Sequence, residues 1–264
     1  MDQETDGAVL VTRPEGSAEG LCARLAQAGY RAVHQPLLVV SPVQHLSDEQ
    51  QGLVRSLDTF QHCVFVSRNA ARYGLAHLRP VWPEWPPGLQ CYAVGDSTAD
   101  VLRTAGLTVQ VPGVDMTSEG LLALPSLRAV AGQRVLIVKG EGGRNALRDA
   151  LIDRGARVEA LRCYRRSAPD LQPSALKKLL RSEQVASILV SSGEVLDNLV
   201  ALLQASGSRH PALTELRLVV PSARVAEQAR ASGWRRVVTA TNASDEAMLS
   251  ALQYSPAVQE KTGD

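Results

Sequence analysis

The sequence lacks the features that mark several large classes of protein. No apolar run in its 264 residues approaches membrane-spanning length, and the opening segment Met1–Glu4 is acidic, unlike the basic start of a signal peptide. It has only four cysteines, with no Cys-x-x-Cys pair among them. This scarcity favours buried, reduced thiols over a metal centre. We therefore expect a cytoplasmic protein that makes no membrane contact and binds no metal.

Net charge is also nearly absent. The 28 basic and 27 acidic residues give a formal charge of +1, so the chain has no basic excess of the kind that nucleic-acid-binding proteins show. Lysine is scarce, because 24 of the 28 basic residues are arginine. Arginine suits planar recognition of carboxylate or phosphate, but a GC-rich coding bias would produce the same excess. Apolar residues make up 45% of the chain, which is enough for a substantial core.

The most informative feature present is a long internal repeat. The stretch 8–38 resembles the stretch 134–166, with Arg13 aligned over Lys139 at an offset of 126. Two more pairs of segments follow in the same order, 62–78 with 186–203 and 91–106 with 217–233. This alignment places Ser67 over Ser191. A repeat of this period indicates two related domains rather than a solenoid.

Within each half, short apolar strand-like runs alternate with helical patterns. Such an alternation is typical of an α/β fold, in which a parallel sheet is covered by helices on both faces. A glycine follows a predicted helix at four places, where a left-handed residue ends a helix at low cost. These glycines are Gly29, Gly106, Gly155 and Gly233.

The turns that follow the strands are the candidate binding rim. Right-handed crossovers place every strand-to-helix turn at the same edge of its sheet, where ligands of such folds bind. These turns are rich in small, hydroxyl-bearing and basic residues, and helix N-termini there offer N–H donors to anions. Each serine or threonine could instead be an ordinary helix cap. The rim residues are Thr12, Arg13, Ser67, Gly95, Lys139, Gly140, Ser191, Ser192 and Ser222.

Taken in order, these segments resemble the uroporphyrinogen-III synthase family. The likeness covers roughly residues 8–252, and it depends on the order of weak motifs and on the duplication, because no single motif is specific. The motifs are VLVTRP (Val9–Pro14), VFVSRNA (Val64–Ala70), AVGDSTA (Ala93–Ala99), KGEGGR (Lys139–Arg144) and VEALRCYRR (Val158–Arg166).

The resemblance implies an architecture that the repeat alone does not. The repeat would place a domain boundary near Ala131. The family has two doubly wound, flavodoxin-like parallel-sheet domains joined by a two-segment extended linker, and its first domain is discontinuous. On this chain the first domain would comprise 1–37 plus 167–264 and the second 38–166, with linkers near 36–43 and 161–169.

The resemblance also implies an activity. Family members are cofactor-independent lyases that cyclise hydroxymethylbilane, a polycarboxylated linear tetrapyrrole, to uroporphyrinogen III with loss of water and inversion of ring D. The substrate would lie in a cleft between the two domains. The resemblance further implies a monomer that makes transient contact with the preceding enzyme of the pathway.

Roles for individual residues follow from the same resemblance. Tyr164 matches the tyrosine that the family places beside the cleft, where its phenol would assist loss of the hydroxyl; it could also be a structural linker residue. Arg13 and Lys139 would either pair with carboxylates or brace their turns. Many family members carry Gly-Pro-Thr where this chain has Pro221 and Ser222, so Ser222 or Arg224 would supply the contact here.

Two other functions remain open on the sequence. A cytoplasmic two-lobed binding protein for a small anionic ligand would share this fold. A two-domain transferase that uses a nucleotide sugar would share it too, although it would normally show a clearer diphosphate site.

Overall fold

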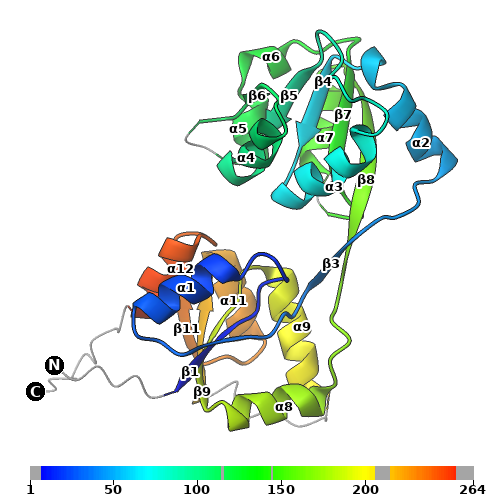
Figure 1. Ribbon diagram of the computed structural model, residues 1–264. Coiled ribbons are helices and arrows are strands. Elements are labelled where there is room, and N and C mark those ends of the chain that lie inside the picture. Colours follow the sequence, from blue (N-terminus) through cyan, green and yellow to red (C-terminus); the bar gives the residue numbers. More distant parts are fainter. Residues whose placement is uncertain (1–6, 114–115, 144, 206–214, 254–264) are drawn as a thin grey trace, which may run out of the picture. The chain divides into compact units, whose positions relative to one another are not determined.

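A computed structural model describes residues 7–113, 116–143, 145–205 and 215–253 of the chain (Figure 1). It divides into two compact units. Unit 1 consists of Met1–Val40 and Ser167–Asp264, and unit 2 consists of Ser41–Arg166. The boundary near Ala131 that the repeat alone favours is therefore not the division observed.

Unit 1 contains a five-stranded sheet in the order β11-β10-β9-β1-β2, and each neighbouring pair is parallel. Its strands are β1 (Ala8–Val11), β2 (Ala32–His34), β9 (Val185–Leu189), β10 (Arg217–Val220) and β11 (Arg236–Thr239). Its helices are α1 (Glu19–Gln27), α8 (Pro173–Ser182), α9 (Gly193–Gln204), α11 (Ala223–Ala231) and α12 (Asp245–Gln253).

Unit 2 contains a six-stranded sheet in the order β3-β8-β7-β4-β5-β6, which is parallel from β8 through to β6. Its strands are β3 (Val39–Pro42), β4 (His62–Phe65), β5 (Gln90–Ala93), β6 (Val109–Gln110), β7 (Arg134–Gly140) and β8 (Arg157–Ser167). Its helices are α2 (Asp48–Arg55), the short 3-10 helix η1 (Leu57–Thr59), α3 (Arg68–Leu78), α4 (Asp96–Thr104), α5 (Ser118–Leu122), α6 (Pro125–Arg128) and α7 (Ala146–Asp153).

The predicted class, two doubly wound parallel sheets, is confirmed. Alternation along β1 shows why both faces of the unit 1 sheet are covered. Ala8 and Leu10 pack into one apolar cluster with α8, α9 and α11, whereas Val9 and Val11 pack into another with α1 and α12 (Figure 1). A strand buried on both sides reads as a continuous apolar run, as this one does. Across the described ranges, no helix has the length and apolarity needed to cross a bilayer.

The internal repeat exists in space, but with an exchange between the halves. The order β2-β1-β9-β10-β11 in unit 1 corresponds, strand for strand, to β8-β7-β4-β5-β6 in unit 2. Strands β1 and β2 belong to the first half of the sequence, yet they pair within a sheet whose other strands come from the second half. Each unit therefore combines the first two strands of one half with the last three of the other.

The four glycines predicted to end helices do so with left-handed backbones. Gly29, Gly106, Gly155 and Gly233 have φ values of 86°, 81°, 82° and 98°. A residue with a Cβ atom is strained in this region, so glycine ends these helices at the lowest cost.

The segments expected to be extended linkers are strands. The N–H of Val43 donates to the carbonyl of Cys163 at 3.0 Å, and β8 continues to Ser167. Helix α2, which the sequence pattern did not reveal, supports the same strand. Its buried Gln50 donates to the carbonyl of Ala160 at 3.0 Å and accepts the N–H of Arg162 at 2.7 Å. The side-chain amide therefore satisfies backbone groups that a neighbouring strand would otherwise pair.

The cysteines behave as small buried side chains. Cys63, Cys91 and Cys163 are buried, Cys22 is half-buried, and all four are free thiols. Burial raises the pKa of Cys91 and that of Cys163 to about 12. Both thiols are therefore protonated, and hence unreactive, at neutral pH.

A buried histidine lies at the opposite edge of the unit 2 sheet from the strand-to-helix turns. His62 opens β4 and is 4% exposed. Its Nδ1 lies 3.0 Å from the hydroxyl of Tyr92, and its Nε2 contacts Oε1 of Gln133. Burial lowers the pKa of His62, and the hydrogen bond to Gln133 offsets part of that effect.

We predict that His62 makes unit 2 less stable in mild acid. The unfolded chain binds a proton near the ordinary histidine pKa of about 6.5, whereas the folded protein binds it only at lower pH. The free energy of unfolding should therefore fall as pH decreases below about 6.5 and level off below the folded pKa. Urea unfolding of wild type and His62→Gln between neutral and mildly acidic pH measures this. His45→Gln, which removes an exposed imidazole, is the control, and an unchanged slope in His62→Gln would contradict the prediction.

Candidate active site

A pocket of about 730 Å³ lies at the carboxyl ends of β4 and β7 in unit 2. From these neighbouring strands the chain leads in opposite directions, β4 toward β5 and β7 toward β8. A reversal of strand order of this kind is where open parallel sheets bind their ligands. Ser67, Lys139, Gly140 and Tyr164, four of the predicted site residues, line this pocket.

Tyr164 is held tightly in the wall of the pocket. Its side chain is only 6% exposed, and its hydroxyl lies 3.1 Å from Oγ of Ser67. Its ring packs against Gly140, where an added Cβ atom would lie 2.6 Å from two ring carbons. The absence of a side chain at Gly140 is therefore what gives the phenol ring its place.

A bulge in β8 aims Tyr164 at this position. Lys139 pairs with Arg162, but the next residue, Gly140, pairs with Tyr164, so Cys163 is the extra residue. Cys163 is fully buried, and its thiol lies 3.7 Å from the carbonyl of Ala70 in α3. Bulges commonly re-aim side chains beside active sites, and this one brings the phenol opposite Gly140.

The pocket is rich in basic side chains. Lys139, Arg148, Arg162 and Arg166 line it, against three acidic residues, of which Glu159 forms an ion pair with Arg134 at 2.8 Å. Burial lowers the pKa of Lys139, and the charges of Arg162, Arg166 and Arg148 lower it further. Because these cations repel one another, an anion bound among them would be stabilised.

The side chains of the equivalent turn in unit 1 make hydrogen bonds and an ion pair within that unit. Thr12 is fully buried, and its hydroxyl donates to the carbonyl of Leu189 at 2.7 Å, so it fastens β1 to β9. The guanidinium of Arg13 forms an ion pair with Asp245 and donates to the carbonyl of Ala243 at 2.7 Å. Both side chains are thus engaged in holding their turn. The polar atoms of Thr12 and Arg13 already have partners within unit 1, and for Arg13 this geometry favours the bracing of its turn, one of the two roles that the sequence left open.

Three of the four rim serines, Ser67, Ser192 and Ser222, are helix caps. Oγ of Ser67 accepts the N–H of Ala70 at the start of α3. At the start of α9 the corresponding cap is Ser192, whose Oγ accepts the N–H of Val195, and not Ser191, which the sequence alignment placed over Ser67. The alignment was therefore wrong by one residue at this turn.

The remaining predicted residues also lie at helix starts. Ser222 caps α11 through the N–H of Val225, and Gly95 occupies the N-cap position of α4. Arg224, in the first turn of α11, is exposed to solvent. In the sequence motif KGEGGR (Lys139–Arg144), Arg144 lies outside the described residues.

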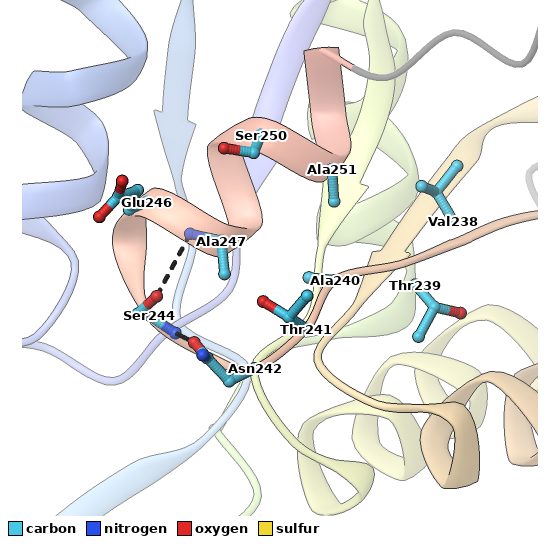
Figure 2. A pocket seen from close by; sticks show the side chains of 10 residues that line it. All are labelled: Val238, Thr239, Ala240, Thr241, Asn242, Ser244, Glu246, Ala247, Ser250 and Ala251. Carbon is cyan, nitrogen blue, oxygen red and sulfur yellow. Dashed lines mark hydrogen bonds between the residues drawn. The ribbon is translucent and has the colours of Figure 1, made fainter. Parts of the chain in front are cut away.

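A second pocket, in unit 1, lacks the chemistry of the first. It has a volume of about 600 Å³ and lies beside the end of β11 and the first turns of α12 (Figure 2). Figure 2 shows the hydroxyls of Thr241, Ser244 and Ser250 and the amide of Asn242 around it, with Glu246 as its charged side chain. None of the predicted site residues lines it, and the lining residues that the structure describes include no cation for an acidic ligand.

Comparison with known proteins agrees with the motifs. A sequence model of the family described as uroporphyrinogen-III synthase HemD matches residues 19–250. The uroporphyrinogen-III synthase of Escherichia coli (strain K12) is 35% identical over 246 residues, which are 93% of this chain and 99% of that protein. That of Salmonella typhimurium is 34% identical over 247 residues, with the same coverage of 93% and 99%.

The chain belongs to the uroporphyrinogen-III synthase family. The resemblance seen in the sequence is thereby confirmed.

Solved structures of the family share the fold. Uroporphyrinogen-III synthetase from Helicobacter pylori 26695 superposes with a TM-score of 0.60 at 15% identity, covering 94% of this chain and 98% of that one. A mutant uroporphyrinogen III synthase from the extremely thermophilic bacterium Thermus thermophilus gives a TM-score of 0.59 at 21% identity, covering 93% and 99%. At identities this low, the likeness supports the two-domain α/β architecture and nothing more specific.

Sequence reasoning missed the basic side chains of this family member's pocket. Arg162 and Arg166 were part of a recognised motif but had no assigned role, and Arg148 was not noticed. A usable signal existed for Arg166, which lies two residues after Tyr164 on the same strand and so shares its face. For Arg162 the signal was weaker, because the bulge at Cys163 interrupts the alternation between Arg162 and Tyr164.

We predict that Gly140→Ala destabilises the protein by about 1–3 kcal/mol, because the new methyl group overlaps the Tyr164 ring. Gly52→Ala is the matched control. Gly52 lies inside α2 with no atom within 4 Å of an added Cβ, so this change should stabilise the helix by about 0.5–1 kcal/mol. Urea unfolding of both variants measures the difference. Equal stability of the two would contradict the packing of Tyr164 on Gly140.

Proposed function

We propose that this protein converts hydroxymethylbilane to uroporphyrinogen III, losing water and inverting ring D of the linear tetrapyrrole. The observation that carries the proposal is the basic pocket at the strand-order reversal of unit 2, with the Tyr164 phenol held in its wall. Family membership supports the assignment, because the relatives that this chain matches carry the name uroporphyrinogen-III synthase.

The reaction depends more on holding the substrate in the correct geometry than on reactive groups of the protein. The terminal hydroxyl of the substrate leaves as water, and the resulting electrophile is attacked by the substituted carbon of the last pyrrole before that ring is inverted and reclosed. Without a template, direct closure of the ring leaves ring D uninverted and gives isomer I. A protein that holds the chain folded gains a large proximity effect.

The cations and N–H groups of the pocket hold the substrate. We propose that Lys139, Arg162 and Arg166 bind substrate carboxylates, since charge-assisted hydrogen bonds to carboxylates are the strong ones. The phenol of Tyr164 donates to the hydroxyl that leaves. On unit 1 we retain Ser191, Ser192, Ser222 and Arg224 as proposed carboxylate contacts, and on unit 2 Gly95, because these residues occupy helix starts, where N–H donors point outward.

The reaction class follows from the proposed chemistry. Loss of water with ring closure makes the enzyme a lyase, and because no atom of the substrate undergoes net oxidation, the reaction calls for no redox cofactor. We also propose that the enzyme acts as a cytoplasmic monomer and receives its unstable substrate by transient contact with the preceding enzyme.

The test of the function is the identity of the isomer formed. Wild-type protein is incubated with enzymatically generated hydroxymethylbilane, and the product is oxidised and separated as uroporphyrin isomers. We expect isomer III in excess over the isomer I that forms without protein. A product mixture identical to the protein-free reaction would contradict the proposed function and favour a binding protein.

Arg13 and Lys139, equivalent in the repeat, should respond differently to substitution. Arg13→Ala should lower the free energy of unfolding by about 1–3 kcal/mol, because it removes charged hydrogen bonds within unit 1, and leave KM unchanged. Lys139→Ala should raise KM by roughly tenfold and leave stability unchanged. Added salt should raise the KM of wild type more than that of Lys139→Ala.

The control for loss of one positive charge is Lys178→Ala, which lies on the exposed face of α8. Thermal unfolding and steady-state kinetics on the three variants separate the two roles. If Lys139→Ala loses stability but keeps its KM, the lysine braces its turn and does not bind substrate.

A further inference from the structure

We propose that Ser67 is a positioning residue for Tyr164: its hydroxyl orients the phenol so that the phenolic O–H points into the pocket. This inference rests on the proposed function and deepens it. It reassigns Ser67, which the sequence placed among direct substrate contacts. Ser67 would then act on turnover through Tyr164, and its loss would not weaken the binding of carboxylates.

The Ser67 oxygen is fixed by the backbone of α3. Its Oγ accepts the N–H of Ala70 at 3.0 Å, and its carbonyl accepts the N–H of Ala71 at 3.0 Å. One lone pair of the hydroxyl is therefore occupied by the helix cap, which leaves its hydrogen available for another acceptor. The phenolic oxygen of Tyr164, at 3.1 Å, is in hydrogen-bond reach.

The direction of the bond between the two hydroxyls follows from what the phenol has to do. At 3.1 Å either oxygen can be the donor. A phenol that donates to the departing hydroxyl of the substrate can only accept from Ser67. The hydrogen bonds then run in one direction, from the N–H of Ala70 to Ser67, from Ser67 to Tyr164, and from Tyr164 to the substrate. Each bond in such a chain strengthens the next donor.

The rest of the phenol ring cannot take up a different place. Gly140 leaves room for the ring and for nothing more, since an added Cβ would lie 2.6 Å from two ring carbons. The ring of Tyr73 lies nearby with its centroid 6.1 Å away. Because the ring is confined, the remaining freedom is the rotation of the phenolic hydrogen, which the hydroxyl of Ser67 sets.

The second copy of the repeat indicates that capping alone does not account for this arrangement. Ser192 caps α9 as Ser67 caps α3, so the cap is present in both units. The repeat offset of 126 places Leu38 at the position of Tyr164 and Pro14 at that of Gly140. Unit 1 thus keeps the capping serine without the phenol and its glycine. The pairing of serine with tyrosine belongs to the pocket of unit 2.

Kinetics of a double-mutant cycle test the proposal. We expect Ser67→Ala to lower kcat by roughly fivefold, the rate equivalent of one ordinary hydrogen bond, with KM unchanged. Tyr164→Phe should lower kcat by at least as much without abolishing turnover. The double variant should be no slower than Tyr164→Phe alone, because Ser67 acts only through the phenol. Ser67→Thr, which keeps both the hydroxyl and the cap, should retain wild-type kcat.

The matched control for a lost helix cap is Ser47→Ala. Ser47 caps α2 in the same unit through the N–H of Gln50, and it has no assigned part in the reaction. It should lose stability as Ser67→Ala does and keep its kcat. The positioning role would be overturned if the double variant lost kcat by the product of the two single losses. A rise in KM for Ser67→Ala would overturn it as well.

A spectroscopic measurement tests the contact without relying on turnover. In protein labelled with 3-fluorotyrosine, the Tyr164 signal in the ¹⁹F spectrum is the one missing from Tyr164→Phe. We expect this signal to shift in Ser67→Ala and to stay in place in Ser67→Thr and Ser47→Ala. An unmoved signal in Ser67→Ala would overturn the proposal even in an inactive preparation.

Different results would contradict the proposed function and the positioning role of Ser67. Wild-type protein that forms no isomer III contradicts the proposed function and, with it, any role of Ser67 in turnover. Wild-type protein that forms isomer III, while Ser67→Ala keeps full kcat, contradicts the positioning role alone.

Discussion

The parallel pairing of β4 with β7 is the contact on which the candidate site depends. It sets Phe65 beside Val138, and so brings the turns after the two strands to one edge of the unit 2 sheet. All four residues of β4 are buried, so a slip by one residue would exchange the side chains that its two buried faces present to the elements packed on them. The register that protects the core therefore also places Ser67 next to the strand whose neighbour carries Tyr164.

The internal repeat supplies two similar frames, and equivalent residues make different contacts in them. The same order of strands occurs in both units, and the same turn follows β1 and β7. In unit 1 this turn carries Arg13, which forms an ion pair with Asp245 and donates a hydrogen bond to the carbonyl of Ala243. In unit 2 it carries Lys139, which stands among arginines at the wall of a pocket. A shared fold thus does not imply a shared role for equivalent residues.

The net charge of the chain does not indicate the basic pocket. The whole chain carries a formal charge of +1, but the pocket gathers four basic side chains against three acidic ones, and Glu159 among the latter is engaged by Arg134. A protein can bind a polyanion with local charge alone, provided that the cations converge on one cavity. The composition of the whole chain does not report how charges are distributed among its cavities, so it carries no information about a cleft of this size.

The sequence by itself determined the parallel α/β class, the helix ends at Gly29 and Gly155, the internal repeat and the family. Each of these can be recognised from the order of residues along the chain, without knowing which side chains meet in space. The discontinuous first domain, and with it the exchange of strands between the halves, was already implied by the family resemblance. The tertiary structure decided the bulge at Cys163, beside Tyr164. It also decided that Ser192, and not Ser191, is the equivalent of Ser67. These features arise from contacts between residues far apart in the sequence, as between Arg13 and Asp245, and local pattern carries no information about which distant partner a side chain will meet.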